Sequence, residues 1–387
     1  MPLQHTLSAL PPLSLYIHIP WCVKKCPYCD FNSHTARDAL PEQRYIEALS
    51  RDLESALPLI WGRGIHSIFF GGGTPSLFSA AAIDQILATV RSLTRLEFFA
   101  EVTLEANPGT VEATKFREFR AAGINRLSLG IQSFNRKHLV ALGRIHDDRE
   151  AHRAIEIAAS CFDNYNLDLM YALPGQTLAQ ASLDLNAALN YKPPHLSCYH
   201  LTLEPNTPFY HQPPALPDDD LSADMQIMIE ENLAGAGYQH YETSAFAQPR
   251  QASQHNLNYW QFGDYLGIGA GAHSKLSFHD RIIRQIRHKH PREYMVHALA
   301  GNPVQAEEVL TSAALGFEFM MNALRLIDGF NISLFSDRTG LPITVIQTML
   351  AKAEQRGLIS RDHLRITPTR LGQRFLNDLL ALFLPAS

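Results

Sequence analysis

The chain has 387 residues, of which 46% are apolar and 18% are charged, so it can bury a large core and is not a disordered polypeptide. Its formal net charge of −5 argues against a general nucleic-acid binder, because such proteins usually carry an excess of basic residues. No apolar run reaches the roughly 20 residues that span a bilayer, and residues 1–12 lack the features of a signal peptide. We therefore expect a cytoplasmic protein.

Strand and helix patterns alternate through the first half of the chain. Short β-branched or aromatic runs are followed by amphipathic stretches, which is typical of βα units around a parallel sheet. The pattern predicts an α/β fold, a partial (β/α)6 TIM-like barrel over residues 1–215. The expected strands are 14–19, 66–70, 98–104, 126–130, 166–171 and 195–201, and the expected helices are 42–57, 80–93, 111–121, 149–160 and 179–189.

The pattern changes after a proline-rich and aspartate-rich break near residue 215. Residues 216–300 are predicted to extend the barrel, with a helix at 222–234, a strand at 238–246 and an aromatic, glycine-rich segment at 254–274. Residues 301–387 are predicted to form a separate winged-helix-like α+β domain. Its expected elements are helices at 312–324, 332–339, 342–356 and 371–384, and a hairpin at 357–367. The acidic net charge favours packing or partner docking over DNA binding for this domain.

Three of the five cysteines stand within eight residues, in the spacing C-x3-C-x2-C. Cys22, Cys26 and Cys29 can hold three corners of an iron–sulfur cluster and leave one iron open. A zinc site needs four ligands, and His34 could complete a Cys3His set. Structural zinc sites usually pair two short ligand segments, whereas here one segment supplies everything, so the spacing favours iron–sulfur and leaves zinc open. Cys161 and Cys198 stand in apolar contexts and are expected in the core.

Polar and glycine-rich segments follow nearly every expected strand. In parallel α/β folds the carboxyl ends of the strands meet at one edge, and chemistry gathers there. Exposed glycine amides can also bind a ligand's carboxylate or amino group. The segments are the cysteine loop, 71–74, 105–108, 132–133, 173–175 and 204–205.

The run from Tyr16 to Cys29 resembles the radical S-adenosylmethionine (SAM) superfamily. That superfamily places CxxxCxxC after the first strand of a partial barrel, with an aromatic residue just before the third cysteine, here Tyr28. The runs at 103–108, 125–133, 142–146 and 166–175 narrow the resemblance to the oxygen-independent coproporphyrinogen III dehydrogenase group. The resemblance implies a [4Fe–4S] cluster on the three cysteines and a SAM pocket lined by Tyr16, Tyr28, Gly72, Gly73, Thr74, Glu105, Gln132, Arg144 and Asp168.

Two features separate the chain from the dehydrogenase itself. The dehydrogenase carries a fourth cysteine two residues after the third, where this chain has Phe31, and a long extension before the cysteine loop, where this chain has 21 residues. The run His255-Asn-Leu-Asn-Tyr-Trp260 resembles the HNxxYW signature of the HemW haem chaperones. That resemblance implies haem binding with His255 as a candidate iron ligand, and other histidines are available, including His200, His240 and His273.

Three hypotheses follow. In the first, the protein is a haem chaperone without coproporphyrinogen dehydrogenase activity, which binds the cluster, SAM and haem and passes haem to apo-haemoproteins such as respiratory enzymes. The resemblance implies peripheral contact with the inner membrane face, no nucleic-acid partner, and a monomer or a cluster-dependent dimer. In the second, it decarboxylates coproporphyrinogen III oxidatively. In the third, it is a Cys3His zinc module whose winged helix binds nucleic acid.

Overall fold

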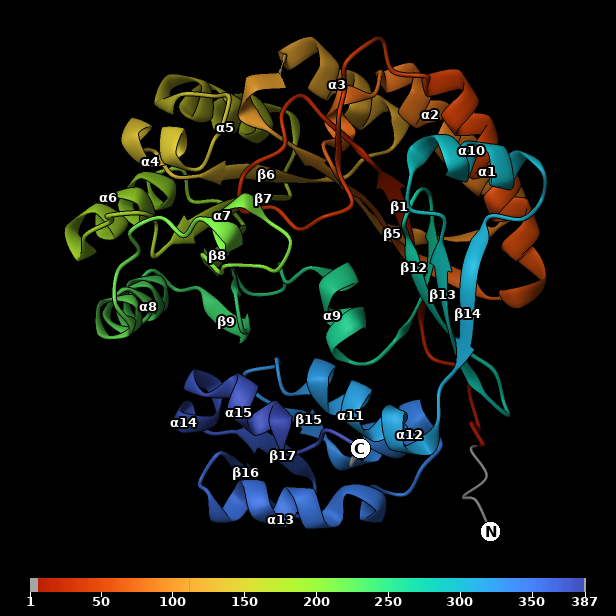
Figure 1. Cartoon of the computed structure of the whole chain (residues 1–387), viewed down its shortest axis with the longest axis vertical. Coiled ribbons are helices and arrows are strands. Elements are labelled where there is room, and N and C mark those ends of the chain that lie inside the picture. Colours follow the sequence, from red (N-terminus) through yellow and green to blue (C-terminus); the bar gives the residue numbers. More distant parts are fainter. Residues whose placement is uncertain (1–5, 111, 386–387) are drawn as a thin grey trace.

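Parallel strands form the centre of the larger part of the molecule (Figure 1). The computed structural model describes residues 6–110 and 112–385. Within them, consecutive strands pair side by side in chain order, which confirms the predicted partial barrel. Their cores are apolar and almost wholly buried, as expected where helices cover a parallel sheet. The strands are β1 (Leu13–Ile19), β4 (Gly64–Gly72), β5 (Arg95–Ala106), β6 (Arg126–Gln132), β7 (Tyr165–Tyr171) and β8 (His195–His200).

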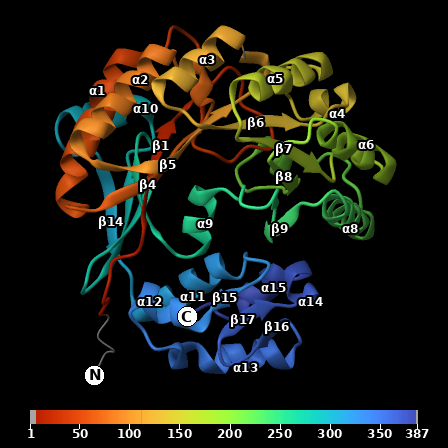
Figure 2. The same ribbon diagram turned by 180° about the vertical axis from the view of Figure 1, so that it is seen from behind.

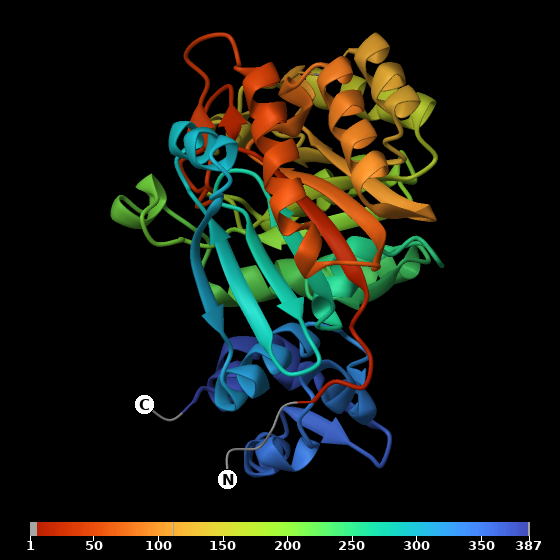
Figure 3. The same ribbon diagram turned by 90° about the vertical axis from the view of Figure 1, so that its right-hand side faces the viewer.

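Helices cover the outer face of this sheet (Figures 1 and 3). Several begin at residues whose side chains cap free backbone amides: Ser79 caps one helix, and Asp147 and Thr177 form capping boxes. The expected helix at 111–121 begins at Ala113, and Val111 lies outside the described residues. The helices are α1 (Glu42–Ala56), α2 (Ala80–Leu93), α3 (Ala113–Ala122), α4 (Arg136–Ala141), α5 (Asp148–Cys161), α6 (Leu178–Leu189), α7 (Pro208–His211) and α8 (Asp219–Gly235).

Further strands extend the sheet at both edges. At one edge β11 (Asp264–Ile268) pairs in parallel with β1, and β12 (His273–Ser277), β13 (Ile282–Arg287) and β14 (Val304–Val309) follow antiparallel. At the other edge the single strand expected at 238–246 is wrong: a turn at Thr243–Ser244 divides it into β9 (Gln239–Glu242) and β10 (Ala245–Ala247), because the chain folds back to pair with itself. The predicted three-part division of the chain stays a prediction.

Two helices accompany these added strands. Helix α9 (Gln254–Trp260) lies in the segment that joins the two edges and carries the HNxxYW run, whereas α10 (Pro291–Leu299) lies between β13 and β14 and packs on α1. Figures 1 and 2 show α9 between β8 on one side and the β11–β14 strands on the other. The HNxxYW run therefore lies at the inner side of the curved sheet.

The C-terminal residues form an α+β unit with its own hydrophobic cluster, built around Phe319 and Phe335. The expected helix at 371–384 is wrong as a single element. The backbone of Phe375 leaves the helical region (φ −111°, ψ 45°), and the chain turns there so that Leu379 enters the core. The elements are α11 (Ser312–Ala323), β15 (Phe330–Asn331), α12 (Ile332–Thr339), a 3₁₀ turn (Ile343–Ile346), α13 (Gln347–Gln355), β16 (Ile359–Arg361), β17 (Arg365–Pro368), α14 (Arg370–Arg374) and α15 (Leu376–Ala381).

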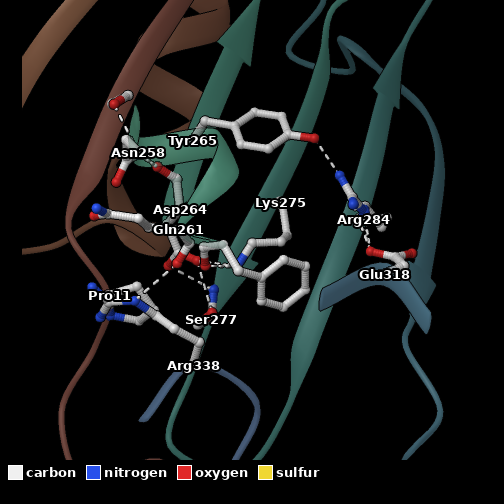
Figure 4. Close-up of polar contacts among 12 residues, drawn as sticks. Pro11, Asn258, Gln261, Asp264, Tyr265, Lys275, Ser277, Arg284, Glu318 and Arg338 are labelled. Carbon is white, nitrogen blue, oxygen red and sulfur yellow. Dashed lines mark hydrogen bonds and ion pairs between the residues drawn. The ribbon is translucent and has the colours of Figure 1, made fainter. Parts of the chain in front are cut away.

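Ion pairs join this unit to the sheet (Figure 4). Arg284 of β13 pairs with Glu318 of α11 at 2.5 Å and also donates to the hydroxyl of Tyr265 on β11. Nearby, buried Asp264 is held by Lys275 at 2.9 Å and Arg63 at 2.8 Å. Separately, no helix in the described part of the chain combines the length and apolar character needed to cross a lipid bilayer.

Candidate functional site

The carboxyl ends of the parallel strands and the cysteine loop enclose a cavity of about 310 Å³, which we call the inner cavity. It brings together residues from Cys22 to Asn256, most of them at the strand ends where the fold class predicts a site. Of the residues singled out from the sequence, it is lined by Cys22, Cys26, Tyr28, Cys29, Gly72, Gly73, Thr74, Glu105, Gln132, Arg144 and Asp168.

The cysteine loop is fixed by hydrogen bonds from neighbouring segments. The carbonyl of Trp21 accepts from the Thr74 amide at 2.7 Å, and the Lys25 ammonium donates to the carbonyl of Phe31 at 3.0 Å. Burial raises the pKa of the Cys22 and Cys29 thiols. Bound iron would keep these buried sulfurs as thiolates, because a coordinating thiol is deprotonated.

The donor set fits a cluster better than a single ion. Among the described residues, no three or more histidine, cysteine, aspartate or glutamate side chains are grouped so as to hold one metal ion. In a [4Fe–4S] cluster each thiolate binds a different iron, so its ligands lie farther apart than those of one zinc. The ring of His34 packs against His290 and lines a different cavity, so it does not complete the Cys3His set.

The glycine turn after β4 allows backbone segments to approach each other closely. Gly72 has φ +117°, and a Cβ there would lie 2.6 Å from the ring of His18. A Cβ on Gly73 would lie 2.5 Å from the carbonyl oxygen of Trp21, next to Cys22. Glycine is therefore required at both positions, and the turn places backbone amides beside the cysteine loop.

Two buried carboxyl groups face the inner cavity. Glu105 accepts from the Gly72 amide at 3.2 Å, and burial, reinforced by the charge of Asp168, raises the pKa of Glu105 to about 8. Burial also raises the pKa of Asp168, whose oxygens accept from Asn166 at 2.7 Å and Ser128 at 3.0 Å. Neither carboxyl group has a cation within ion-pair distance among the described residues. A ligand with an amino group or hydroxyls would supply the missing donors.

Arg144 stands between the cysteine loop and β6. Its guanidinium donates to the carbonyl of Gly130 at 2.6 Å and to the amide oxygen of Asn107 at 2.5 Å, and it lies 3.8 Å from the sulfur of Cys26. Gln132 has φ +67° next to a register shift in β6. Strained backbone of this kind at a cavity wall is typical of functional sites.

Sequence reasoning missed several residues of the inner cavity. Asn107 donates to the hydroxyl of Thr74 at 2.9 Å and also contacts Arg144. Its position one residue after β5 could have identified it in the sequence. Asn166 lies inside β7, two residues before Asp168 and therefore on the same face, so this alternation could have identified it. Further missed residues include Arg126, Ser128, Ser197, Tyr199 and Asn256.

Tyr16 lines a second and larger space, which we call the outer cavity, of about 920 Å³. Its hydroxyl contacts Nδ1 of His18 at 2.9 Å. The two cavities share a wall of Cys29, Phe31, Ser33, Gly72 and Glu105. The inner and outer cavities are therefore neighbours, separated by this shared wall.

His255 lines neither cavity. It is 4% exposed, its ring stacks on Phe69 at 4.9 Å, and its Nδ1 lies 3.0 Å from the hydroxyl of Ser67. Burial lowers the pKa of His255 to about 3. From the same run, Asn256 lines the inner cavity and Tyr259 lines the outer cavity. Ligation of haem by His255 stays a prediction.

Family models match two parts of the chain. Residues 16–185 match the model of the Radical SAM superfamily, and residues 310–375 match that of the HemN C-terminal domain. The first match covers β4 to β7 and most of β1, whose ends line the inner cavity or stand beside it. The second covers most of the α+β unit.

Individual proteins resemble the chain over nearly its full length. It is 48% identical over 379 residues to the haem chaperone HemW of Escherichia coli, covering 97% of this chain and 99% of the relative. It is 49% identical over 384 residues to HemW of Haemophilus influenzae, covering 98% and 99%. Among solved structures, the coproporphyrinogen III oxidase HemN of Escherichia coli, a radical SAM enzyme, superposes with a TM-score of 0.82 at 25% identity, covering 97% of this chain and 90% of that one.

Proposed function

Since the chain belongs to the HemW family of radical SAM proteins, we propose that it is a haem chaperone, which binds haem and transfers it to apo-haemoproteins. The observation that carries the proposal is the identity of almost half of all residues to HemW proteins along the whole chain. Both cavities and the C-terminal unit lie within the region that matches, so the similarity is not restricted to the common barrel.

The cofactors are a [4Fe–4S] cluster and SAM. We assign the cluster to Cys22, Cys26 and Cys29, and when bound it supplies an iron that can accept a ligand and an electron. SAM would occupy the rest of the inner cavity. There the amides of the glycine turn would bind its carboxylate or amino group, and Glu105 and Asp168 would accept hydrogen bonds from its amino group and ribose hydroxyls. Tyr28, Thr74, Gln132 and Arg144 would complete the walls, with Tyr16 at the neighbouring cavity.

The acceptors that we propose are apo-forms of respiratory haemoproteins, reached by peripheral contact with the membrane face. Aromatic contacts around the HNxxYW run support haem binding, since the ring of His255 packs against Phe69 and Tyr259. His255 is the iron ligand implied by that family signature.

A transfer experiment tests the function. Anaerobically reconstituted protein, loaded with one equivalent of haem, is mixed with an apo-cytochrome, and holo-cytochrome is followed by its absorbance and its enzymatic activity. We expect transfer faster than from serum albumin loaded with the same amount of haem. The proposal is wrong if the reconstituted protein binds no haem. It is also wrong if the protein transfers haem to the apo-cytochrome no faster than albumin does.

A second candidate is oxidative decarboxylation of coproporphyrinogen III, favoured by the fold shared with the oxidase. Phe31 stands where that group carries its fourth cysteine, and its side chain, 58% exposed, lines both cavities. We therefore expect no protoporphyrinogen from an anaerobic assay with SAM and reductant. Formation of that product at a catalytic rate would favour the oxidase function.

A further inference from the structure

The outer cavity has the size and position for a ligand larger than SAM. Its volume of about 920 Å³ is close to the upper end of the roughly 300–1,000 Å³ typical of small-molecule sites, and about three times that of the inner cavity. It lies across the open side of the barrel. Glu204–Asn206, which follow β8, form one wall, and His273, at the start of β12, belongs to the other. Figures 1 and 2 show these strands on opposite sides of α9.

Tyrosine rings supply a flat apolar surface in this cavity. Tyr259 of α9 and Tyr265 of β11 stack with ring centroids 4.2 Å apart and planes 24° apart, and both line the cavity. Tyr16 lines it from β1. Aromatic faces of this kind pack well against a planar conjugated ligand such as a porphyrin.

Three histidines line the outer cavity, and they differ in what their rings already contact. Both ring nitrogens of His18 are engaged, by the hydroxyl of Tyr16 at 2.9 Å and the carbonyl of Asn32 at 2.9 Å. The ring of His34 packs edge-on against His290, and its Nε2 is buried. His273 is exposed to the cavity, and no side chain or backbone group among the described residues hydrogen-bonds its ring.

His273 is also better placed than the histidine of the family signature. The ring of His255 lies between Phe69 and Tyr259 and is 4% exposed, so iron could reach it only if α9 moved away from the sheet. The ring of His273 needs no such movement, because β12 already presents it to the cavity. It stands on the sheet two strands away from Tyr16, and Gly267 of β11 lies between the two.

Both basic and acidic side chains line the outer cavity. Lys289 is exposed at the β12–β13 side, near His273, and its ammonium has no ion-pair partner among the described residues. Lys25 also lines the cavity, but its ammonium already holds the carbonyl of Phe31. The acidic side chains that line the cavity include Asp30, on the cysteine loop, and Glu204, on the loop after β8. Anionic carboxylates of a ligand would therefore point toward Lys289.

On these grounds we propose that the cargo haem binds in the outer cavity, with the imidazole of His273 as iron ligand, the Tyr259–Tyr265 pair against the porphyrin plane, and Lys289 beside a propionate. The inference rests on the proposed haem-chaperone function and names the seat of the cargo. Haem in the outer cavity would lie beside the wall that separates this cavity from the inner cavity, and Cys29 of the cysteine triad is part of that wall.

Anaerobic titration of reconstituted full-length protein with haemin, followed by its Soret absorbance, tests the assignment. We expect His273→Ala to weaken haem binding by about tenfold or more, since even partners of metal ligands contribute about 10–100-fold to affinity. His273→Cys should bind haem with the altered spectrum of thiolate ligation. Lys289→Gln should weaken binding about two- to fivefold without changing the spectrum, since an exposed ammonium pairs only weakly with a carboxylate in water.

The matched control is His288→Ala. The ring of His288 stacks on His297 at 3.9 Å on the segment next to Lys289, and it lines neither cavity. This variant should bind haem as the wild type does. An unchanged affinity and spectrum in His273→Ala would overturn the proposal, as would loss of the imidazole spectrum in folded His255→Ala with retention in His273→Ala. If the wild-type protein itself takes up no haem, the failure belongs to the proposed function and not to the choice of cavity.

Discussion

The two cavities on either side of the cysteine loop are built in different ways. The inner cavity is small, and its polar groups come from the ends of consecutive parallel strands and are already held by hydrogen bonds. The outer cavity is about three times larger, and its walls combine β1 and the ends of β4 and β5 with two added strands, one helix and several loops. The barrel thus provides a prearranged site of the kind that one fixed cofactor needs. The outer cavity resembles a site that must both accept and release its ligand.

The largest expected effect separates the two cavities. Cys26→Ser should abolish the cluster, with iron and sulfide near background, because the remaining thiolates leave two irons without a protein ligand. Cys26 lines the inner cavity only, so haem affinity should change less than about threefold, which is below 1 kcal/mol. Metal analysis and haem titration measure both quantities.

The matched control is Cys161→Ser, a partly buried cysteine at the end of α5 that lines neither cavity. It should keep both the cluster and haem affinity. A parallel collapse of haem binding in Cys26→Ser would show that the two cavities act as one site.

This contrast also explains what the sequence could predict. The strands and most helices of the barrel were predicted within a few residues, because short apolar runs, amphipathic stretches and caps such as Ser79 leave local patterns. The cysteine triad and the strand-end motifs located the inner cavity, since parallel strands bring their carboxyl ends to one edge. The outer cavity could not be predicted, because Tyr16, Glu204 and His273 come together only through the pairing of β11 with β1.

The next effect concerns a buried carboxyl group of the inner cavity, in protein to which no SAM has been added. The carboxyl group of Glu105, with its pKa of about 8, keeps its proton in the folded protein to higher pH than in the unfolded chain, where it ionises near pH 4.5. The folded state therefore binds more protons between these values, and the contribution of Glu105 to the free energy of unfolding falls as pH rises from about 4.5 to 8. Glu105→Gln should remove this loss and raise the free energy of unfolding at pH 9 by about 2–4 kcal/mol, with little change at pH 5.

Urea unfolding at the two pH values measures this difference. Glu204→Gln, which removes a half-buried carboxyl group on the loop that bounds the outer cavity, is the control, and its free energies of unfolding should match those of the wild type. An equal stabilisation of Glu105→Gln at pH 5 and pH 9 would contradict the assignment of a protonated carboxyl group to the inner cavity.

A smaller effect is expected at the glycine turn. Gly73→Ala would place its Cβ 2.5 Å from the carbonyl oxygen of Trp21, so the backbone beside Cys22 must shift. Such overpacking costs about 1–3 kcal/mol, and we expect SAM affinity, measured by calorimetry on the reconstituted protein, to fall about tenfold. Gly235→Ala, at the end of α8 with open space around its Cβ, should leave SAM affinity unchanged. Equal SAM binding by both variants would remove the glycine turn from the SAM site.

The smallest effect tests whether the C-terminal unit supports the outer cavity. Arg284 connects Glu318 on α11 to the hydroxyl of Tyr265, whose ring lines that cavity (Figure 4). The pair is partly exposed, so Glu318→Gln should cost only about 0.5–1 kcal/mol of unfolding free energy. Haem affinity should fall about two- to threefold, because Arg284 is then free to turn away from Tyr265, and cluster content should stay constant. The exposed pair of Arg281 and Asp280 is the matched control, and Asp280→Asn should change neither quantity. A loss of SAM affinity in Glu318→Gln equal to its loss of haem affinity would mean that the C-terminal unit supports the barrel as a whole and not the outer cavity in particular.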